Sequence, residues 1–351
     1  MKSKKFLSLL FVLAMVFSLV SCGGADTAPN DAPGTSSDAS TPADGPTYVW
    51  RFHHGLATDH PYHIGATKFA ELCAEKSGGR IQIDIFPGSQ LGSERETYEM
   101  LQMGTLDFAS NTTSPLVNFD PSFAIFDMPF LFRDKQHAYS VLDGEIGDEK
   151  FESLENYGMH GLAWWECGMF NLVYSGDPIR VPDDMKGRTF RTMETEVTMS
   201  WVAATGANPV PMAWAEVFTA LQNGTVDGTI LPYTTTFFNK IYTVAPNYTL
   251  LNVTYSPVPL VISKQTWDPL PDDIKAILEE AAVESRDYMR EYSNNVEAEI
   301  RQTMENEGVN LIDLTQEEMD QWVDTITEKA YPQLIPSWFS QDEVDRIQAV
   351  Q

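Results

Sequence analysis

The sequence predicts an α/β fold of two similar lobes that share one long helix. A short phrase occurs twice, as LQMGTLD at 101–107 and as LQNGTVD at 221–227, with five of seven residue types in common. Segments typical of strands and of helices alternate around both copies. A run of about 35 residues without proline or glycine follows Pro271. As a helix this run would measure roughly 50 Å, enough to lie across both lobes as a spine.

The first series of elements starts with YVWRFHH (48–54), an apolar strand, and a helix predicted at 61–77 that stops at two glycines. RIQIDIF (80–86) then alternates isoleucine with polar residues, as a half-buried strand does. Ser93 to Glu96 forms a capping box, which begins the next helix. Strands and helices in alternation favour a lobe with a parallel sheet.

Each copy of the repeated phrase joins an amphipathic run to a glycine and then to a short apolar run. Glycine ends helices because it takes the left-handed conformation without a Cβ clash. We interpret the repetition as one helix-to-strand step used once in each lobe, with chance recurrence of common punctuation as the alternative.

A long strand is predicted between the copies at GLAWWECGMFNLVYS (161–175), and it could cross between the lobes. The second series then begins with a strand at 186–193, a helix at 194–206 and a strand at 207–212. The helix and strand of the second copy complete it.

The N-terminus has the layout of a secretory signal at 1–21: three lysines, a short apolar core and a small residue before Cys22. The sequence Leu19-Val20-Ser21-Cys22 resembles a bacterial lipobox, in which the cysteine becomes the lipidated N-terminus. An ordinary signal peptide with a chance cysteine is the alternative. Residues 22–47 lack large apolar side chains and predict a disordered linker.

Composition excludes several classes of protein. The 50 acidic and 23 basic residues give a formal net charge of −27, which disfavours binding to nucleic acid or to anionic lipid. Cys73 and Cys167 show no metal-ligand spacing, and whether they form a disulfide or two buried thiols stays open. We expect no metal and no cofactor, since no phosphate-binding loop or metalloprotease motif occurs.

Several longer motifs in order resemble the substrate-binding subunit of a tripartite ATP-independent periplasmic (TRAP) transporter, an extracytoplasmic solute receptor. The resemblance covers about 48–331 and rests on EKSGGRIQIDIFPGSQLGSERE, DMPFLFRDKQHAYSVLDGEIG, PDDMKGRTFR, GANPVPMAWAEVFTALQNGTVDG and LPDDIKAILEEAA. It implies a periplasmic-binding-protein-like fold with a ligand cleft between lobes. We expect lobe I at 48–167 plus 256–295 and lobe II at 168–255 plus 296–351.

The resemblance also implies that a strand in the context K-G-x-x-x-R supplies an arginine for the ligand carboxylate, here Arg191. A guanidinium matches a carboxylate because its planar donors reach both oxygens. Two departures remove polar groups: Phe170 replaces a second arginine that many relatives carry, and Leu231 lies where relatives often continue Gln-Glu-Asn. They favour a ligand with an aliphatic or aromatic body. The other candidate ligand contacts are Trp165, Glu166, Tyr233, His53, His54, Asn111, Thr112, Ser114, Asn208 and Trp214.

The resemblance implies a lipoprotein on the outer face of the cell membrane that captures a small organic acid and passes it to TRAP membrane subunits. A binding protein of an ATP-driven importer is the first alternative. An exported enzyme is the second, but the acidic and histidine residues show no spacing that selects a nucleophile. Ligand identity, oligomeric state and the kind of cell envelope stay open.

The lipobox yields a prediction about the mature N-terminus. Mass spectrometry of the native protein should find a lipid-modified Cys22 as its first residue. The variant Cys22→Ala should carry no lipid and should keep an unprocessed or differently cleaved N-terminus. An unmodified native N-terminus that starts elsewhere would contradict the prediction.

Overall fold

The computed structural model describes residues 45–335 and 337–351. The predicted signal peptide at 1–21, Cys22 and all but the last three residues of the predicted linker lie outside the described residues. The described part forms one compact unit. Within it, no helix combines the length and the apolar character that a membrane crossing needs.

One mixed sheet of nine strands carries the described fold, in the order β2-β1-β3-β8-β4-β7-β5-β6, with β9 beside the start of β8. The strands of each lobe pair in parallel, whereas β8 runs antiparallel to both β3 and β4. The strands are Tyr48–His53 (β1), Ile81–Phe86 (β2), Phe108–Ser110 (β3), Met159–Tyr174 (β4), Thr189–Thr192 (β5), Asn208–Pro211 (β6), Gly228–Leu231 (β7), Asn247–Ser263 (β8) and Asn310–Asp313 (β9). The predicted α/β class is confirmed.

The helices match the predicted runs and add a C-terminal group that the sequence analysis did not resolve. The capping box at Ser93 is present, with the Ser93 side chain and the Glu96 carboxylate each bonded to the other's backbone N–H. The helices are Pro61–Lys76 (α1), Glu94–Gln102 (α2), Lys135–Leu142 (α3), Glu145–Leu154 (α4), Glu196–Ala204 (α5), Val217–Gln222 (α6), Tyr233–Phe238 (α7), Lys264–Trp267 (α8), Asp272–Asn306 (α9), Gln316–Lys329 (α10), Tyr331–Leu334 (α11) and Gln341–Gln348 (α12).

The repeated phrase has the same local structure in both places. Its glycine has φ +68° in each copy, after α2 and after α6. Its aspartate then accepts a backbone N–H from a neighbouring strand: Asp107 from Arg51 of β1 at 2.9 Å, and Asp227 from Thr189 of β5 at 2.7 Å. Both lobes therefore use the same turn from helix to strand and the same hydrogen bond from a neighbouring strand to the aspartate.

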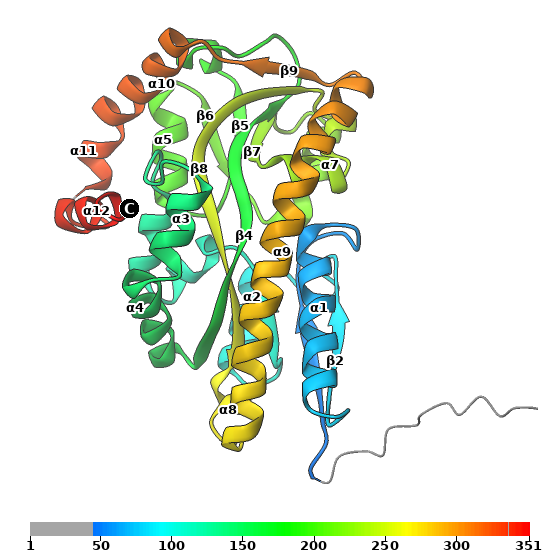
Figure 1. Cartoon of the computed structure of the whole chain (residues 1–351). Coiled ribbons are helices and arrows are strands. Elements are labelled where there is room, and N and C mark those ends of the chain that lie inside the picture. The colour runs from blue at the N-terminus through cyan, green and yellow to red at the C-terminus, as the bar shows by residue number, and fades with distance from the viewer. Residues whose placement is uncertain (1–44, 336) are drawn as a thin grey trace, which may run out of the picture. The chain divides into compact units, whose positions relative to one another are not determined.

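Strands β4 and β8 continue from the lobe that holds β1 to the lobe that holds β5 (Figure 1). Their ladder has three irregularities, of which the middle one falls between Glu166 and Gly168. Gly168 has φ +116°, a conformation that L side chains rarely adopt. It pairs with Ser256, so the two expected lobe boundaries lie opposite each other on this ladder.

Helix α9 runs alongside the two long strands (Figure 1) and packs against α1 and α7. Buried Arg290 fixes its middle: the guanidinium donates to both carboxylate oxygens of Asp143 at 2.6 and 3.0 Å and to the carbonyl of Trp164 at 2.6 Å. It also lies 4.1 Å from the centre of the Tyr139 ring. Planar stacking together with a two-pronged carboxylate contact is specific to arginine.

The C-terminal residues 314–351 return from the second lobe to the first. Near their start, Glu318 pairs with Arg180; near their end, Arg346 pairs with Glu149 of α4 at 2.6 Å. Arg133 donates to the carbonyls of Gln348 and Val350, both at 2.7 Å. Helix α12 thus contacts residues that the sequence analysis assigns to lobe I, although it assigns 296–351 to lobe II.

Two clusters of buried apolar side chains form the core, and the larger one extends from the first lobe to α5 and α12. Cys73 and Cys167 are both buried free thiols. The open question of a disulfide between them is therefore answered as two thiols in this structure.

Truncation of Arg290 tests how α9 is held. Removing one partner of a buried ion pair costs about 3–5 kcal/mol. Because Asp143 keeps 28% of its side chain exposed, water weakens this pair, and Arg290→Ala should lower the free energy of unfolding by a smaller amount, about 2–3 kcal/mol. Arg301→Ala, in the same helix with 38% exposure, is the control and should cost under about 1 kcal/mol. Urea unfolding measures both; equal costs would refute this account.

Candidate functional site

Two adjoining cavities lie where the end of β5, the start of α2 and the segment after β6 meet. They share five lining residues, namely Glu94, Thr112, Arg191, Met193 and Trp214. The cavity that Tyr62, Phe170 and Leu231 also line is called the inner cavity and has a volume of about 40 Å³. The cavity that Arg95, Ser114 and Glu194 also line is called the outer cavity and has a volume of about 20 Å³. Because one water needs about 10–15 Å³, the two cavities have room for only a few water molecules in this conformation.

Arg191, on β5, is the basic side chain of the inner cavity. It is 5% exposed, and its Nε and Nη2 both donate to the carbonyl of Met212, at 3.0 and 2.8 Å. No described residue accepts a hydrogen bond from Nη1. Burial lowers the pKa of Arg191 to about 10, partly offset by Glu94 and Glu194, so the side chain stays cationic at neutral pH. A buried cation with a free donor is suited to an anionic ligand.

Glu94, the first residue of α2, lines the same cavities. Its two carboxylate oxygens accept from the backbone N–H and the hydroxyl of Thr112, at 3.0 and 2.8 Å. Burial raises the pKa of Glu94 despite these bonds and despite Arg191. No ion pair within 4.0 Å joins Glu94 to Arg191 among the described residues, so the two charges face the cavities separately.

The remaining inner lining is mostly apolar and comes from both lobes: Leu56, Tyr62, Cys167, Phe170, Leu231 and Thr235. Several hydrogen bonds join the lobes beside it, including one between the Cys167 thiol and the Thr235 hydroxyl at 3.5 Å. The indole of Trp214 donates to the carbonyl of Gly55 at 3.1 Å, and His60 lies 3.2 Å from the Thr235 hydroxyl. Trp214 also lines both cavities, so its indole lies between the two lobes beside this space.

Six of the predicted contacts line these cavities: Thr112, Ser114, Phe170, Arg191, Trp214 and Leu231. Ser114 is engaged within the protein, because its hydroxyl donates to Asp127 at 2.7 Å. The second carboxylate oxygen of buried Asp127 has no partner among the described residues. Burial raises the pKa of Asp127 to about 6, although the bond from Ser114 opposes the rise.

The structure does not bring the other seven predicted contacts to the cavities. Trp165 packs in the core at 5.9 Å from Phe52, and Tyr233 stacks on Tyr248 at 4.6 Å. Glu166 accepts from Tyr139 at 2.8 Å, away from the cavity lining. These side chains occupy positions that support the strands around the site.

Four polar candidates also lie outside the lining of the two cavities. His53 is fully buried, and His54 contacts His63 at 3.1 Å. Asn111 donates to the Thr97 hydroxyl at 2.9 Å. Asn208 is exposed at the start of β6, whereas Arg191 pairs with Val210 further along that strand.

Sequence reasoning missed Glu94, Met193, Tyr62, Cys167, Thr235 and Leu56. Glu94 lies inside the motif that predicts the start of α2. The sequence therefore predicts its place in the first turn of a helix, but not its place in a cavity. Tyr62 follows Pro61 at the start of α1 and carries no local mark of a ligand contact.

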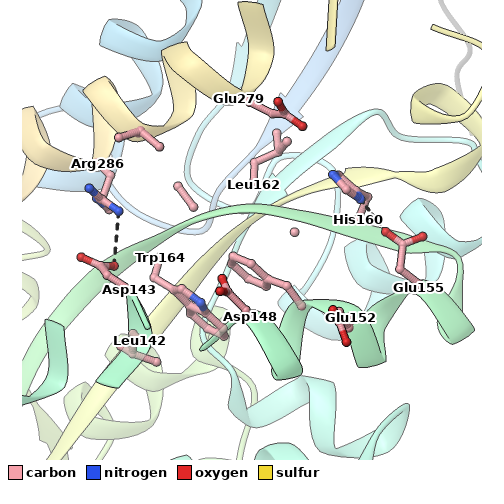
Figure 2. Close-up of a pocket in the computed structure, with 14 residues that line it drawn as sticks. Leu142, Asp143, Asp148, Glu152, Glu155, His160, Leu162, Trp164, Glu279 and Arg286 are labelled. Carbon is pink, nitrogen blue, oxygen red and sulfur yellow. Dashed lines mark hydrogen bonds and ion pairs between the residues drawn. The ribbon is translucent and has the colours of Figure 1, made fainter. Parts of the chain in front are cut away.

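A larger groove of about 480 Å³ lies on another face, between α4, β4 and α9. Figure 2 shows Asp148, Glu152, Glu155 and Glu279 around it, with an ion pair between Arg286 and Asp143 at 3.4 Å. Its excess of carboxylates would repel an organic acid. Asp148, Glu152 and Glu279 are exposed, as expected of a solvated face of an acidic protein.

Comparison with known proteins gives consistent matches. The model of the family "Bacterial extracellular solute-binding protein, family 7" matches residues 52–334. The C4-dicarboxylate-binding periplasmic protein DctP of Rhodobacter capsulatus is 34% identical over 82% of this chain and 87% of its own length.

Two solved TRAP periplasmic solute-binding proteins match in three dimensions. One, from Polaromonas, holds D-erythronate; it is 33% identical, with a TM-score of 0.83, over 86% of this chain and 99% of its own. Another, from Sulfurospirillum deleyianum, holds succinate; it is 30% identical, with a TM-score of 0.82, over 88% of this chain and 100% of its own. The same scaffold therefore holds both hydroxylated and dicarboxylic four-carbon acids.

The raised pKa of Asp127 gives a prediction about pH. Its pKa in the folded protein is about 6 against an ordinary 3.8, so the folded state binds a proton that the unfolded chain binds only at lower pH. This group therefore adds stability as pH falls through 6 and loses it as pH rises. Asp127→Asn should raise the free energy of unfolding at pH 8 by up to about 3 kcal/mol, at 1.36 kcal/mol per pKa unit.

The difference between native protein and Asp127→Asn should vanish near pH 4. Exposed Asp148→Asn is the control and should shift the unfolding curve little at either pH. Urea unfolding at several pH values measures the effect, and a difference that is constant from pH 4 to 8 would show that Asp127 is ionised throughout.

Proposed function

Because the chain belongs to family 7 of the bacterial extracellular solute-binding proteins, which are substrate-binding subunits of TRAP transporters, we propose that it captures a small organic acid and delivers it to the membrane subunits of such a transporter. The family consists of extracytoplasmic binding proteins rather than enzymes. The ligand would bind in the inner cavity and its outer extension.

Arg191 carries this proposal. Its guanidinium is 5% exposed. Two of its nitrogens bond to one carbonyl, and the third nitrogen is free. An anion that bonds to this nitrogen would replace the water contacts that burial removed and would stabilise the charge. The ligand carboxylate would accept from Nη1. Relatives that hold erythronate and succinate support an acid as the ligand.

The six predicted residues that line the cavities are the proposed contacts of the ligand, together with Glu94 and Tyr62. Phe170 and Leu231 replace polar groups that relatives often carry, so an apolar part of the ligand would lie against them. The seven predicted residues that do not line the cavities would act indirectly, by holding β1, β4 and α7 in place.

Binding would proceed by closure of the lobes. Ligand enters an open form, and the contacts Trp214–Gly55 and His60–Thr235 then form over it. The irregularity at Gly168, where β4 passes between lobes, is the proposed hinge. Closure excludes water, which strengthens the contact between Arg191 and the carboxylate. The closed surface would be what the membrane subunits recognise.

Lipid at Cys22 would tether the receptor to the outer face of the cell membrane. The support is the lipobox-like sequence and the linker composition of 22–47. Removal of residues 1–21 takes away three lysines, so the mature chain would carry 20 basic and 50 acidic residues, a formal net charge of −30. This charge would keep it from adhering to anionic headgroups.

Substitution of Arg191 tests the proposed function. Arg191→Ala should weaken binding of the cognate acid about 30-fold to several-thousand-fold, because truncating one partner of a desolvated charge pair costs about 2–5 kcal/mol. Arg191→Lys should recover little, since an ammonium cannot reproduce the planar group that bonds the Met212 carbonyl through two nitrogens and leaves a third for the ligand. Calorimetry with acids found in a thermal-shift screen measures the affinities.

Arg188→Ala is the matched control, because Arg188 lies three residues earlier, outside both cavities, and donates to backbone carbonyls of Ser175 and Asp177. Its affinity should stay within about threefold of native. If Arg191→Ala also stays within about threefold, the cavities do not hold the acid through Arg191.

A further inference from the structure

We propose that the ligand is a hydroxy monocarboxylic acid whose hydroxyl lies between Tyr62 and Glu94 while Arg191 holds its carboxylate, and that this cavity rejects dicarboxylic acids. The inference rests on the proposed function and narrows it to a class of acid. It separates this chain from the C4-dicarboxylate-binding relative that it resembles in sequence.

Tyr62 supplies the first observation. Its side chain is 1% exposed and lines the inner cavity, and its hydroxyl has no oxygen or nitrogen partner among the described residues. The polar group beside it is the Cys167 thiol, which is only a weak hydrogen-bond partner. After burial, the groups that raise its pKa include Cys167 and Glu94, and both of these line the same cavity. A buried hydroxyl without a partner is costly, so a ligand that accepts from Tyr62 would be favoured.

Glu94 supplies the second observation, because its carboxylate accepts hydrogen bonds whereas the Tyr62 hydroxyl can donate one. A carboxylate has about four acceptor sites, and Thr112 uses two of them. The remaining sites can accept from a ligand donor. Thr112 also fixes the orientation of this carboxylate through both its backbone and its hydroxyl, so Glu94 presents the acceptor without reorganising.

One hydroxyl group satisfies both residues, because it accepts from Tyr62 and donates to Glu94 at once. A keto group would accept from Tyr62 but would face the Glu94 carboxylate with a second acceptor. A methylene would leave both residues without a partner. Sites built to bond a substrate hydroxyl discriminate strongly against analogues that lack it.

A second carboxylate is disfavoured by charge. Among the described residues that line the inner cavity, Arg191 alone is basic and Glu94 alone is acidic. A dicarboxylate would place its second charge near Glu94, and Arg95, the further basic residue of the outer cavity, already pairs with Glu99 at 3.1 Å. Such like-charge contacts in a desolvated site are costly. The apolar residues Leu56, Phe170 and Leu231 offer it no donor.

Six four-carbon acids test the proposal on the native full-length protein: butanoate, 2-, 3- and 4-hydroxybutanoate, erythronate and succinate. By calorimetry, at least one hydroxy acid should bind about tenfold or more tighter than butanoate, and succinate should bind more weakly than that hydroxy acid. Tyr62→Phe should reduce the advantage of the hydroxy acid over butanoate by about tenfold.

Glu94→Gln keeps the shape and removes the charge, so it should narrow the gap between succinate and the hydroxy acid by about tenfold. Tyr157→Phe, a partly buried tyrosine outside both cavities, is the control and should change no ratio. Ratios of affinities within one variant cancel any general loss of stability.

The outcomes separate the two proposals. If Arg191→Ala abolishes binding but butanoate or succinate binds the native protein as tightly as every hydroxy acid, this inference is overturned and the proposed function stands. Ratios unaffected by Tyr62→Phe and Glu94→Gln would also overturn it. If Arg191→Ala binds all six acids as the native protein does, the proposed function fails, and this inference fails with it.

Discussion

Two strands of 16 and 17 residues, β4 and β8, must stay hydrogen-bonded to each other while they serve two lobes. This constraint organises the molecule. β3 joins one end of the pair and β7 the other, so each lobe is an extension of the same ladder. A fully regular ladder would resist bending. The three irregularities along it, with Gly168 at the middle one, permit a change of direction without loss of the pairing as a whole.

The position of Arg191 follows from this framework. Asp227 accepts the backbone N–H of Thr189 and so fixes the start of β5 two residues before the arginine. The guanidinium is then held by the carbonyl of Met212, just beyond β6. Its charge is costly to bury, as the lowered pKa of about 10 indicates. A rigid strand position and a protein-bonded guanidinium together present a donor that has few conformations to lose on binding.

Local signals made much of the fold predictable. The capping box at Ser93 and the glycine stops of the repeated phrase depend on nearby residues only, and each occurs where expected. The strand β8 was not anticipated, because prolines at 257 and 259 argue against a central strand. The site was predictable in part. Arg191 followed from the resemblance, whereas Glu94 and Tyr62 line a cavity together with residues distant in sequence, such as Phe170 and Leu231, and no local pattern encodes that proximity.

The C-terminal segment has a consequence for synthesis of the chain. Arg133 in the first lobe is bonded to carbonyls of Gln348 and Val350, and α12 belongs to the same apolar cluster as the first three strands. Residues 341–351 are synthesised about 200 residues after the first strands they pack against. The first lobe therefore cannot reach its final packing before residues 341–351 have left the ribosome.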